Sequence, residues 1–450
     1  FHADAMFLFN LVPEFSMAQW RLGLMYRDAE GVEQDLVKAF SFFEKAANQG
    51  DPRAICDLGM CYRHGRGVEK DVKKGVALFR QGTDLGHVTS IYDLAIEFLY
   101  GEDGVEKDEA QAITLFTQAA DLGHLKSLCR LGLIYRTGLA SVPESRDPRK
   151  AVEYFLKGVE KDDPKSALYL AEMYLNGEGI ERNVDQALHF FEMAANLGLA
   201  EAQRILGIMY VQGKEVPIDY EKAAKLFQSA ADQGDNYSRY YLGVMYENGE
   251  GVEKDELKAA DLFQRGANEG HSFSQYSLAL KYLSGRPGFD DPAKGVFLLE
   301  QAANQGYAPA LAELGAVYLQ SKGVPRDAQK AAACFVRAAE MGNLAAQANL
   351  GYLLLNGEIR APADIKRAFH FLHLAADQGF VLARLNLGVA FYHGIGVEKD
   401  FRKAAEFLHL AALQNDDRAK TALKMMYSHG QGVAEDLAKA ATFVSSASQS

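Results

Sequence analysis

The sequence YYLGVMYENGEGVEKDELKAADLFQRGANEG, residues 240–270, decides the fold of this 450-residue chain. In its first part, Leu242 and Tyr246 recur at the spacing that places side chains on one face of a helix. In its last part, Ala259 and Phe263 recur at the same spacing, and a glycine follows as a stop signal. The stretch therefore predicts a helix, a short glycine-rich loop and a second helix.

The same pattern returns along the whole chain. A Leu-Gly pair, or Leu-Ala in its place, recurs every 36 to 39 residues, and self-similarity at such a period is typical of repeat architectures. The second residue of each pair marks one unit, and the twelve positions are Gly23, Gly59, Ala95, Gly132, Ala171, Gly207, Gly243, Ala279, Gly315, Gly351, Gly388 and, in a degenerate last copy, Lys424. We therefore expect twelve helix–loop–helix units.

The small residue of the pair indicates close packing between helices. Glycine inside a helix costs about 1 kcal/mol relative to alanine, so its recurrence needs a reason. Alanine replaces it at 95, 171 and 279. A small side chain is therefore required at this position, and glycine itself is not.

The loop between the two helices most often reads Gly-x-Gly-Val-Glu-Lys-Asp. Its first glycine, Gly249 in the quoted stretch, stands where the end of a helix favours a positive φ. Its Asp255 is placed to cap the N-terminus of the second helix. A glycine-rich loop can also hold phosphate, but that use requires a preceding strand, and none is predicted. We interpret the loop as a helix–loop–helix turn.

These motifs resemble the Sel-1-like repeat family, which is related to tetratricopeptide repeats, and the resemblance covers residues 16–450. It implies an all-α fold, an α/α superhelical solenoid of about twelve repeats. Residues 1–15 are predicted to be an N-terminal cap or remnant helix. Residues 16–450 are predicted to form a single solenoid domain, with the last unit as a degenerate cap.

Composition narrows the choice of partners. The formal net charge of −12 argues against nucleic acid and against an anionic membrane surface. No stretch approaches the ~18 consecutive apolar residues of a membrane span, so membrane insertion is not expected. The family resemblance favours a periplasmic or secreted protein, with a cytoplasmic one as the alternative.

The four cysteines do not suit a disulfide framework. Cys56 and Cys61 lie about 140° apart around a helix. Cys56 and Cys129 occupy equivalent places two units apart, roughly 20 Å in a helical stack, whereas a disulfide needs Cα atoms within about 7 Å. Together with Cys334 they predict four free thiols. Some bacterial members of the resembled family staple each repeat with a disulfide, and that pattern is missing here.

The resemblance places the first helix of every unit on an inner, concave face, where a protein or peptide partner would bind. At the position of Asp28 the units carry mostly amides, hydroxyls and imidazoles, which either contact a partner or form an ordinary solvated face. Aromatic residues gather in units five, seven and eight, and aromatics are favoured as interface anchors. The predicted partner-binding residues are Tyr169, Tyr237, Tyr240, Tyr241, Phe273 and Tyr276.

The sequence offers little chemistry. His370 and His373 are three residues apart on a predicted helix, and His409 follows one unit later, but no carboxylate or cysteine completes a tetrahedral metal set. We predict no catalytic residue, metal or cofactor, and hence no enzyme. The favoured function is a non-enzymatic scaffold or adaptor, which the resemblance associates with bacterial virulence or host-factor binding. The alternatives are an immunity or inhibitor protein that wraps a toxin or enzyme, and a metal-dependent protein that uses these histidines.

Overall fold

The computed structural model describes residues 15–358 and 362–433. They divide into two compact units, the first ending at Ala230 and the second beginning at Ala231. The predicted cap over residues 1–15 lies outside the described residues except for Phe15, as does the serine-rich end of the last repeat.

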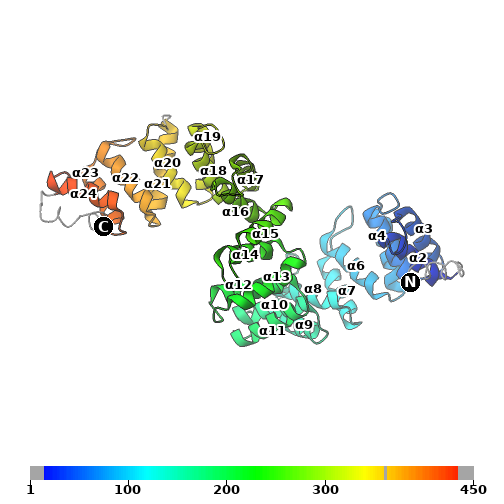
Figure 1. Cartoon of the computed structure of the whole chain (residues 1–450). Helices are drawn as coiled ribbons and strands as arrows, with labels where there is room; N and C mark the ends of the chain where they lie inside the picture. Colours follow the sequence, from blue (N-terminus) through cyan, green and yellow to red (C-terminus); the bar gives the residue numbers. More distant parts are fainter. Residues whose placement is uncertain (1–14, 359–361, 434–450) are drawn as a thin grey trace. The chain divides into compact units, whose positions relative to one another are not determined.

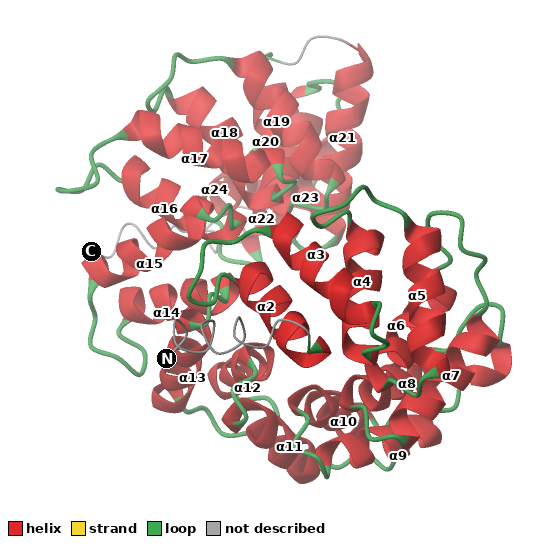
Figure 2. Cartoon of the chain, turned by 90° about the vertical axis from the view of Figure 1, so that its right-hand side faces the viewer, coloured by secondary structure: helices red, strands yellow, loops and turns green. Residues whose placement is uncertain are grey.

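The described chain is helical throughout and contains no named strand, and Figures 1 and 2 show helix following helix. The all-α prediction is confirmed. The first helices of the units are α2 (Ser16–Asp28), α4 (Pro52–His64), α6 (Val88–Tyr100), α8 (Leu125–Thr137), α10 (Pro164–Asn176), α12 (Ala200–Gln212), α14 (Asn236–Asn248), α16 (Ser272–Leu283), α18 (Ala308–Gln320), α20 (Leu344–Leu355), α22 (Val381–His393) and α24 (Asp417–Ser428).

The second helices alternate with them, and consecutive helices pack against one another from α2 to α12 and from α14 to α24. They are α3 (Leu36–Ala47), α5 (Val72–Asp84), α7 (Glu109–Asp121), α9 (Pro148–Val159), α11 (Val184–Asn196), α13 (Tyr220–Asp232), α15 (Glu256–Asn268), α17 (Pro292–Asn304), α19 (Ala328–Glu340), α21 (Pro362–Asp377) and α23 (Phe401–Ala412). A single 3₁₀ turn, η1 (Pro143–Ser145), lies in the long loop of unit four.

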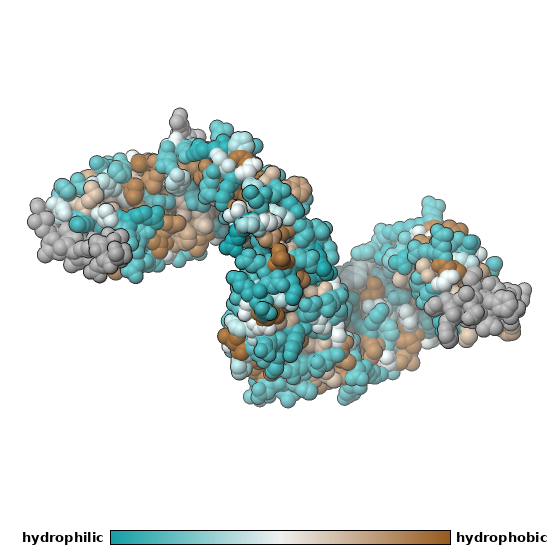
Figure 3. All heavy atoms as spheres, viewed as in Figure 1, coloured by the Kyte–Doolittle hydropathy of each residue, from teal (hydrophilic) through white to brown (hydrophobic). Residues whose placement is uncertain are grey.

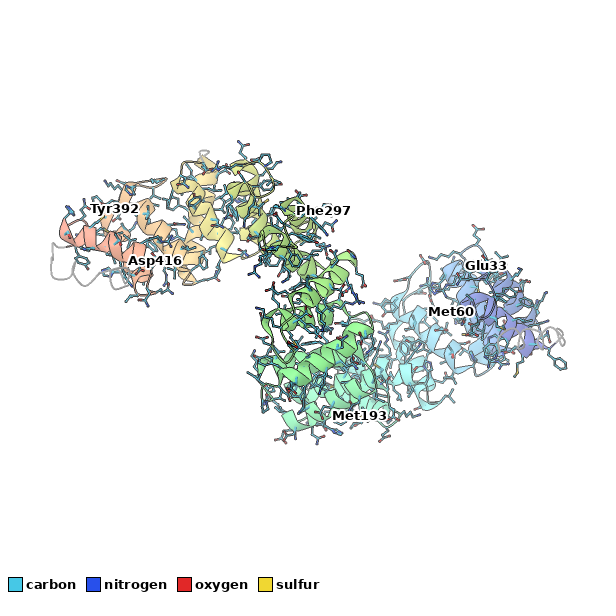
Figure 4. The ribbon with its side chains drawn as sticks, viewed as in Figure 1. Glu33, Met60, Met193, Phe297, Tyr392 and Asp416 are labelled. Atoms are coloured by element: carbon cyan, nitrogen blue, oxygen red, sulfur yellow. The ribbon has the colours of Figure 1, made fainter. Side chains whose placement is uncertain are left out.

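The helix ends form as the loop sequence predicts. Gly249 closes α14 with φ of 78°, and Asp255 accepts hydrogen bonds from the backbone N–H groups of Leu257 and Lys258 at 3.0 and 2.9 Å. The N–H of Asp255 also donates to the carbonyl of Tyr246 at 2.9 Å, which closes the loop. Asp416, labelled in Figure 4, caps α24 in the same way through Ala419.

The small residue of the Leu-Gly pair makes room for an aromatic ring from the second helix. A Cβ added to Gly243 would lie 2.6 Å from Cε1 of Phe263, far inside van der Waals contact. Phe263 is fully buried, and equivalent phenylalanines fill the core of most repeats. The prediction that this position serves close packing is confirmed. The equivalent buried rings are Phe43, Phe79, Phe116, Phe155, Phe191, Phe227 and Phe335.

Two ion pairs of opposite polarity join neighbouring first helices. Arg63 on α4 donates from Nε to Glu97 on α6 at 2.6 Å, and Lys281 on α16 donates to Glu247 on α14 at the same distance. Glu97 and Lys281 occupy a core position that holds Met or an aliphatic residue in most other units. Each of these two buried charges therefore suits only a neighbouring repeat that carries the opposite charge, because a buried charge needs its partner.

Candidate functional site

Five of the six predicted binding residues lie on two consecutive first helices of the second compact unit. Tyr237, Tyr240 and Tyr241 belong to α14, and Phe273 and Tyr276 belong to α16. Residues three or four apart share a helix face, so each helix presents its aromatic residues on one side, near its N-terminus.

Their rings form one connected cluster, in which two residues that the sequence argument did not include take part. Phe273 lies at the centre, with ring centroids 5.5 Å from Tyr240 and 5.8 Å from Tyr237. His271 stacks on Phe273 at 5.5 Å, and Tyr307 lies 4.8 Å from it. We call the set of Tyr237, Tyr240, Tyr241, His271, Phe273, Tyr276 and Tyr307 the aromatic cluster.

The remaining members join through these rings. Tyr241 contacts Tyr240 at 5.5 Å, and Tyr276 meets Tyr307 edge-on at 5.4 Å. Tyr240 also lies 6.0 Å from the core ring of Phe263. The aromatic cluster is thus anchored in the hydrophobic core at one side, and α14, α16 and α18 all contribute to it.

Tyr307 stands at a place where several other units carry a capping residue. It is the N-cap of α18 and forms no side-chain cap hydrogen bond. In contrast, Asp235 caps α14 by accepting from the N–H of Ser238 at 2.7 Å. Losing such a cap costs about 1 kcal/mol. The tyrosine therefore does not serve the end of its own helix, and its ring serves the aromatic cluster.

His271 is the N-cap of α16, and its Nδ1 lies 2.9 Å from the hydroxyl oxygen of Ser274. The sequence pattern His-x-x-Ser, which units three and four share through His87 and His124, gives the same contact there. Burial lowers the pKa of His271, so its ring is neutral at physiological pH.

Three phenols of the aromatic cluster, those of Tyr240, Tyr276 and Tyr307, are neutral groups that can donate a hydrogen bond. Burial raises the pKa of Tyr240 and Tyr276, and it raises the pKa of Tyr307 to about 12. Neither Tyr276 nor Tyr307 hydrogen-bonds to another described residue through its hydroxyl. The surface can therefore offer apolar rings and hydroxyl donors together, as interface anchors do.

The cluster is partly open to solvent. Tyr237 is 45% exposed, and the other members are half-buried. Figure 3 shows a largely hydrophilic visible face, broken by small hydrophobic patches. At the C-terminal ends of the same three helices, Asn248, Ser284 and Gln320, which stand at the position of Asp28, are exposed.

Tyr169 lies in the first compact unit, on α10. Its ring packs 5.5 Å from that of Phe155 on α9, and burial raises its pKa. Tyr169 is not part of the aromatic cluster of α14, α16 and α18, and its role in partner binding remains a separate prediction.

The histidines considered for metal binding have other contacts. His373 packs 5.7 Å from the ring of Phe407, and a ring nitrogen of His409 lies 2.9 Å from the hydroxyl of Tyr427. Across the described residues there is no group of three or more His, Cys, Asp or Glu side chains placed to hold a metal ion.

The four cysteines are free thiols. Burial raises the pKa of Cys61 and Cys129 to about 11, and raises that of the other two. Over the same described part of the chain, no helix is both long and apolar enough to cross a bilayer.

Comparison with known proteins agrees with this repeat structure. The Sel1 repeat profile matches twelve consecutive segments, namely residues 16–51, 52–87, 88–124, 125–163, 164–199, 200–235, 236–271, 272–307, 308–343, 344–380, 381–416 and 419–449. The chain belongs to the Sel1 repeat family. The twelve units and the family expected from the sequence are confirmed.

A solved structure shows the same fold in a bacterial protein. This Sel1 repeat chain is similar to c5321, a protective antigen present in uropathogenic Escherichia coli strains, with 28% identity and a TM-score of 0.71 over 90% of this chain and 85% of that one. It is also similar to a Sel1 repeat protein from Oxalobacter formigenes, with 28% identity and a TM-score of 0.44 over 48% of this chain and 85% of that one.

A curated relative matches over a short segment. An uncharacterized protein of Neisseria meningitidis is 39% identical over 71 residues, which are 16% of this Sel1 repeat chain and 15% of the relative. The Sel1 repeat fold is typically used for protein–protein interaction, and the family is generally one of non-enzymatic scaffolds.

Proposed function

We propose that this Sel1 repeat protein is a non-enzymatic adaptor that binds a protein or peptide through the aromatic cluster of α14, α16 and α18. The observation that carries the proposal is the connected set of half-buried rings around Phe273, with Tyr237 45% exposed at its edge. Rings of this kind bury a large area at low entropic cost when a partner covers them.

The position of Tyr307 supports the proposal. The N-caps Phe15, Leu199 and Phe380 also lack a side-chain cap, so the support comes from the contact of the Tyr307 ring with Phe273 at 4.8 Å. The unused hydroxyls of Tyr276 and Tyr307 would donate to carbonyl groups of a bound chain. Binding would concentrate on a few such anchors, as it does in most interfaces.

The test compares the aromatic cluster with an exposed ring elsewhere in the second compact unit. Phe297 on α17, labelled in Figure 4, is 56% exposed and lies on a second helix, so Phe297→Ala is the matched control. The double variant Tyr241→Ala/Phe273→Ala should retain its helical circular dichroism and lose partner capture from a lysate of the source organism by at least about 30-fold. Capture that is unchanged in the double variant, or equally reduced in the control, would reject the proposal.

Similarity to an antigen of uropathogenic bacteria supports a host-facing role for the adaptor. Fractionation of the producing cells tests this extension, since the protein should then be found outside the cytoplasmic fraction. Recovery in the cytoplasm alone would remove the host-facing role and leave the adaptor itself untouched.

A further inference from the structure

We propose that the partner is recognised through a cationic side chain, Lys or Arg, held between Glu313 and the rings of Tyr276 and Tyr307. This inference rests on the proposed function and names the chemistry of the partner. It starts from a comparison of two equivalent places in the repeat array.

The first place lies between α2 and α4, where an aromatic residue and a carboxylate meet. The indole Nε1 of Trp20 donates to Oδ2 of Asp57 at 2.7 Å. Arginines of the same chain contact both members of this pair. Arg27 donates to Asp57 at 2.9 Å, and the guanidinium of Arg53 lies 4.3 Å from the Trp20 ring centroid, while that of Arg21 lies at 5.1 Å.

The second place lies between α16 and α18, where the repeat puts the same kinds of residue. Tyr276 stands where Trp20 stands, and Glu313 where Asp57 stands. The carboxylate of Glu313 lies close enough to Tyr276 to raise its pKa, second only to burial. The repeat register thus places a carboxylate near Tyr276, without the hydrogen bond that joins Trp20 to Asp57.

The arginines are absent from this second place. In the repeat register, the positions of Arg21, Arg27 and Arg53 are occupied here by Ser277, Leu283 and Pro309, in that order. Among the described residues Glu313 forms neither an ion pair nor a hydrogen bond. Neighbouring acids differ from it, because Glu247 is paired with Lys281 and Glu269 with Arg239.

Glu313 is also the one formal charge at five positions of the first helices here, and the charges beside them, Glu247 and Lys281, pair with each other. The same five helix positions, taken from α14, α16 and α18, otherwise hold aromatic, aliphatic and neutral polar residues. They are Tyr237, Tyr240, Tyr241, Val244, Asn248, Phe273, Tyr276, Ser277, Leu280, Ser284, Pro309, Ala312, Glu313, Ala316 and Gln320.

A lone carboxylate in an aromatic setting is complementary to a cation. Ring faces attract ammonium and guanidinium groups, most strongly when water is excluded. A carboxylate adds a charge-assisted hydrogen bond, and guanidinium can use both at once. A partner's Arg would thus supply to Tyr276 and Glu313 what Arg27 and Arg53 supply to Trp20 and Asp57.

The test uses defined peptides and the full chain. Acetyl-Gly-Arg-Gly-amide and the same peptide with citrulline, which is nearly isosteric and neutral, are titrated and followed by ligand-observed NMR. The arginine peptide should bind with a Kd near 1 mM, and the citrulline peptide at least about fivefold more weakly. Equal binding of the two peptides, or no binding of the arginine peptide at 10 mM (roughly ten times the expected Kd), would overturn the inference.

Three variants locate the site. Glu313→Gln should weaken binding of the arginine peptide at least about fivefold, whereas Glu398→Gln, which changes an exposed loop acid, should leave it unchanged. Pro309→Arg places an internal cation where Arg53 stands and should compete with the peptide to a similar extent. A Glu313→Gln variant that binds within twofold of the parent chain would overturn the inference.

The same variant separates this inference from the proposed function. If Tyr241→Ala/Phe273→Ala loses the partner and Glu313→Gln keeps it at full affinity, recognition of a cation is wrong and the adaptor function stands. If the aromatic double variant captures the partner normally, the proposed function itself fails.

Discussion

The packing of Gly243 against Phe263 allows a sharp test of how each repeat is held together. A methyl group on Gly243 would enter the space of the ring, at 2.6 Å from Cε1 and 2.9 Å from Cδ1. Overpacking of this kind costs about 2 kcal/mol, whereas replacing glycine by alanine in a helix gains about 1 kcal/mol. Gly243→Ala should therefore destabilise the repeat by about 1 kcal/mol.

The chain itself shows a way to relieve the clash. In unit eight, Ala279 stands at the glycine position, and the second helix supplies Leu299 in place of the phenylalanine; both residues are fully buried. Ala95 and Ala171 instead share their repeats with the buried phenylalanines Phe116 and Phe191, so a repeat spaced for alanine accepts a ring, and the cost of Gly243→Ala is that of shifting a ring that packs directly on Gly243. In a Phe263→Leu background, the leucine can move away from the added methyl. Gly243→Ala should then stabilise by about 1 kcal/mol, because only the gain in helix propensity remains.

The two substitutions should thus be coupled by about 2 kcal/mol in a double-mutant cycle. Native-state hydrogen exchange measures this coupling through the local free energy of opening of amides in α14 and α15. Amides of α22 serve as an internal control and should not change. Additive effects, with Gly243→Ala costing the same in both backgrounds, would refute the packing account.

Three further predictions concern charges and thiols. Glu97→Ala should cost about 3 kcal/mol in urea unfolding because it leaves Arg63 half-buried without its main partner. The charge-swapped pair Arg63→Glu/Glu97→Arg should recover part of this loss, since Glu247 and Lys281 already use that polarity, but not all of it, because Glu102 and Asp103 also pair with Arg63; no recovery would contradict the account. Burial raises the pKa of Asp93 to about 6 from its usual 3.8, so the stability that its protonated form gives is fully present below about pH 4 and is lost as pH rises through 6. At pH 8 the free energy of unfolding of Asp93→Asn, measured with urea, should therefore exceed that of the parent chain by about 2 to 3 kcal/mol. Its stability should also change less between pH 4 and 7, and parallel pH profiles of the two chains would contradict the prediction. The three buried cysteines, Cys56, Cys61 and Cys129, should react with Ellman's reagent only in denaturant, because burial raises their thiol pKa values. Cys334 is partly buried and should react slowly in the native protein. Rapid reaction of more than one thiol would contradict this burial.

Much of the fold follows from local rules that each repeat states again. Asp255 caps a helix and Gly249 ends one because of their own backbone chemistry, so a single unit is enough to predict them. Close packing at the small residue could be inferred because alanine substitutes for glycine at Ala95, Ala171 and Ala279, but the buried ring that Gly243 faces was not predicted.

The candidate site was harder to predict because it depends on contacts between repeats. Tyr307 reaches Phe273 only through the stacking of α16 and α18, which the sequence of one unit does not encode, whereas His271 stacks on Phe273 from two residues away at the start of α16. A signal did exist, since Tyr307 puts an aromatic ring where several other units have a capping side chain. The empty cation position beside Glu313 likewise emerges only when it is compared with the filled one around Trp20.

Site-specific photo-crosslinking tests the central claim most directly. The chain carries p-benzoylphenylalanine at position 273 in one sample and at position 297 in the other, so that an aromatic cluster residue is compared with an exposed phenylalanine of α17. Irradiation in lysate of the source organism should give a discrete protein adduct from position 273 and none from position 297. An adduct at 297 instead, or none at 273 in a lysate from which the unmodified chain captures a partner, would contradict binding at the aromatic cluster.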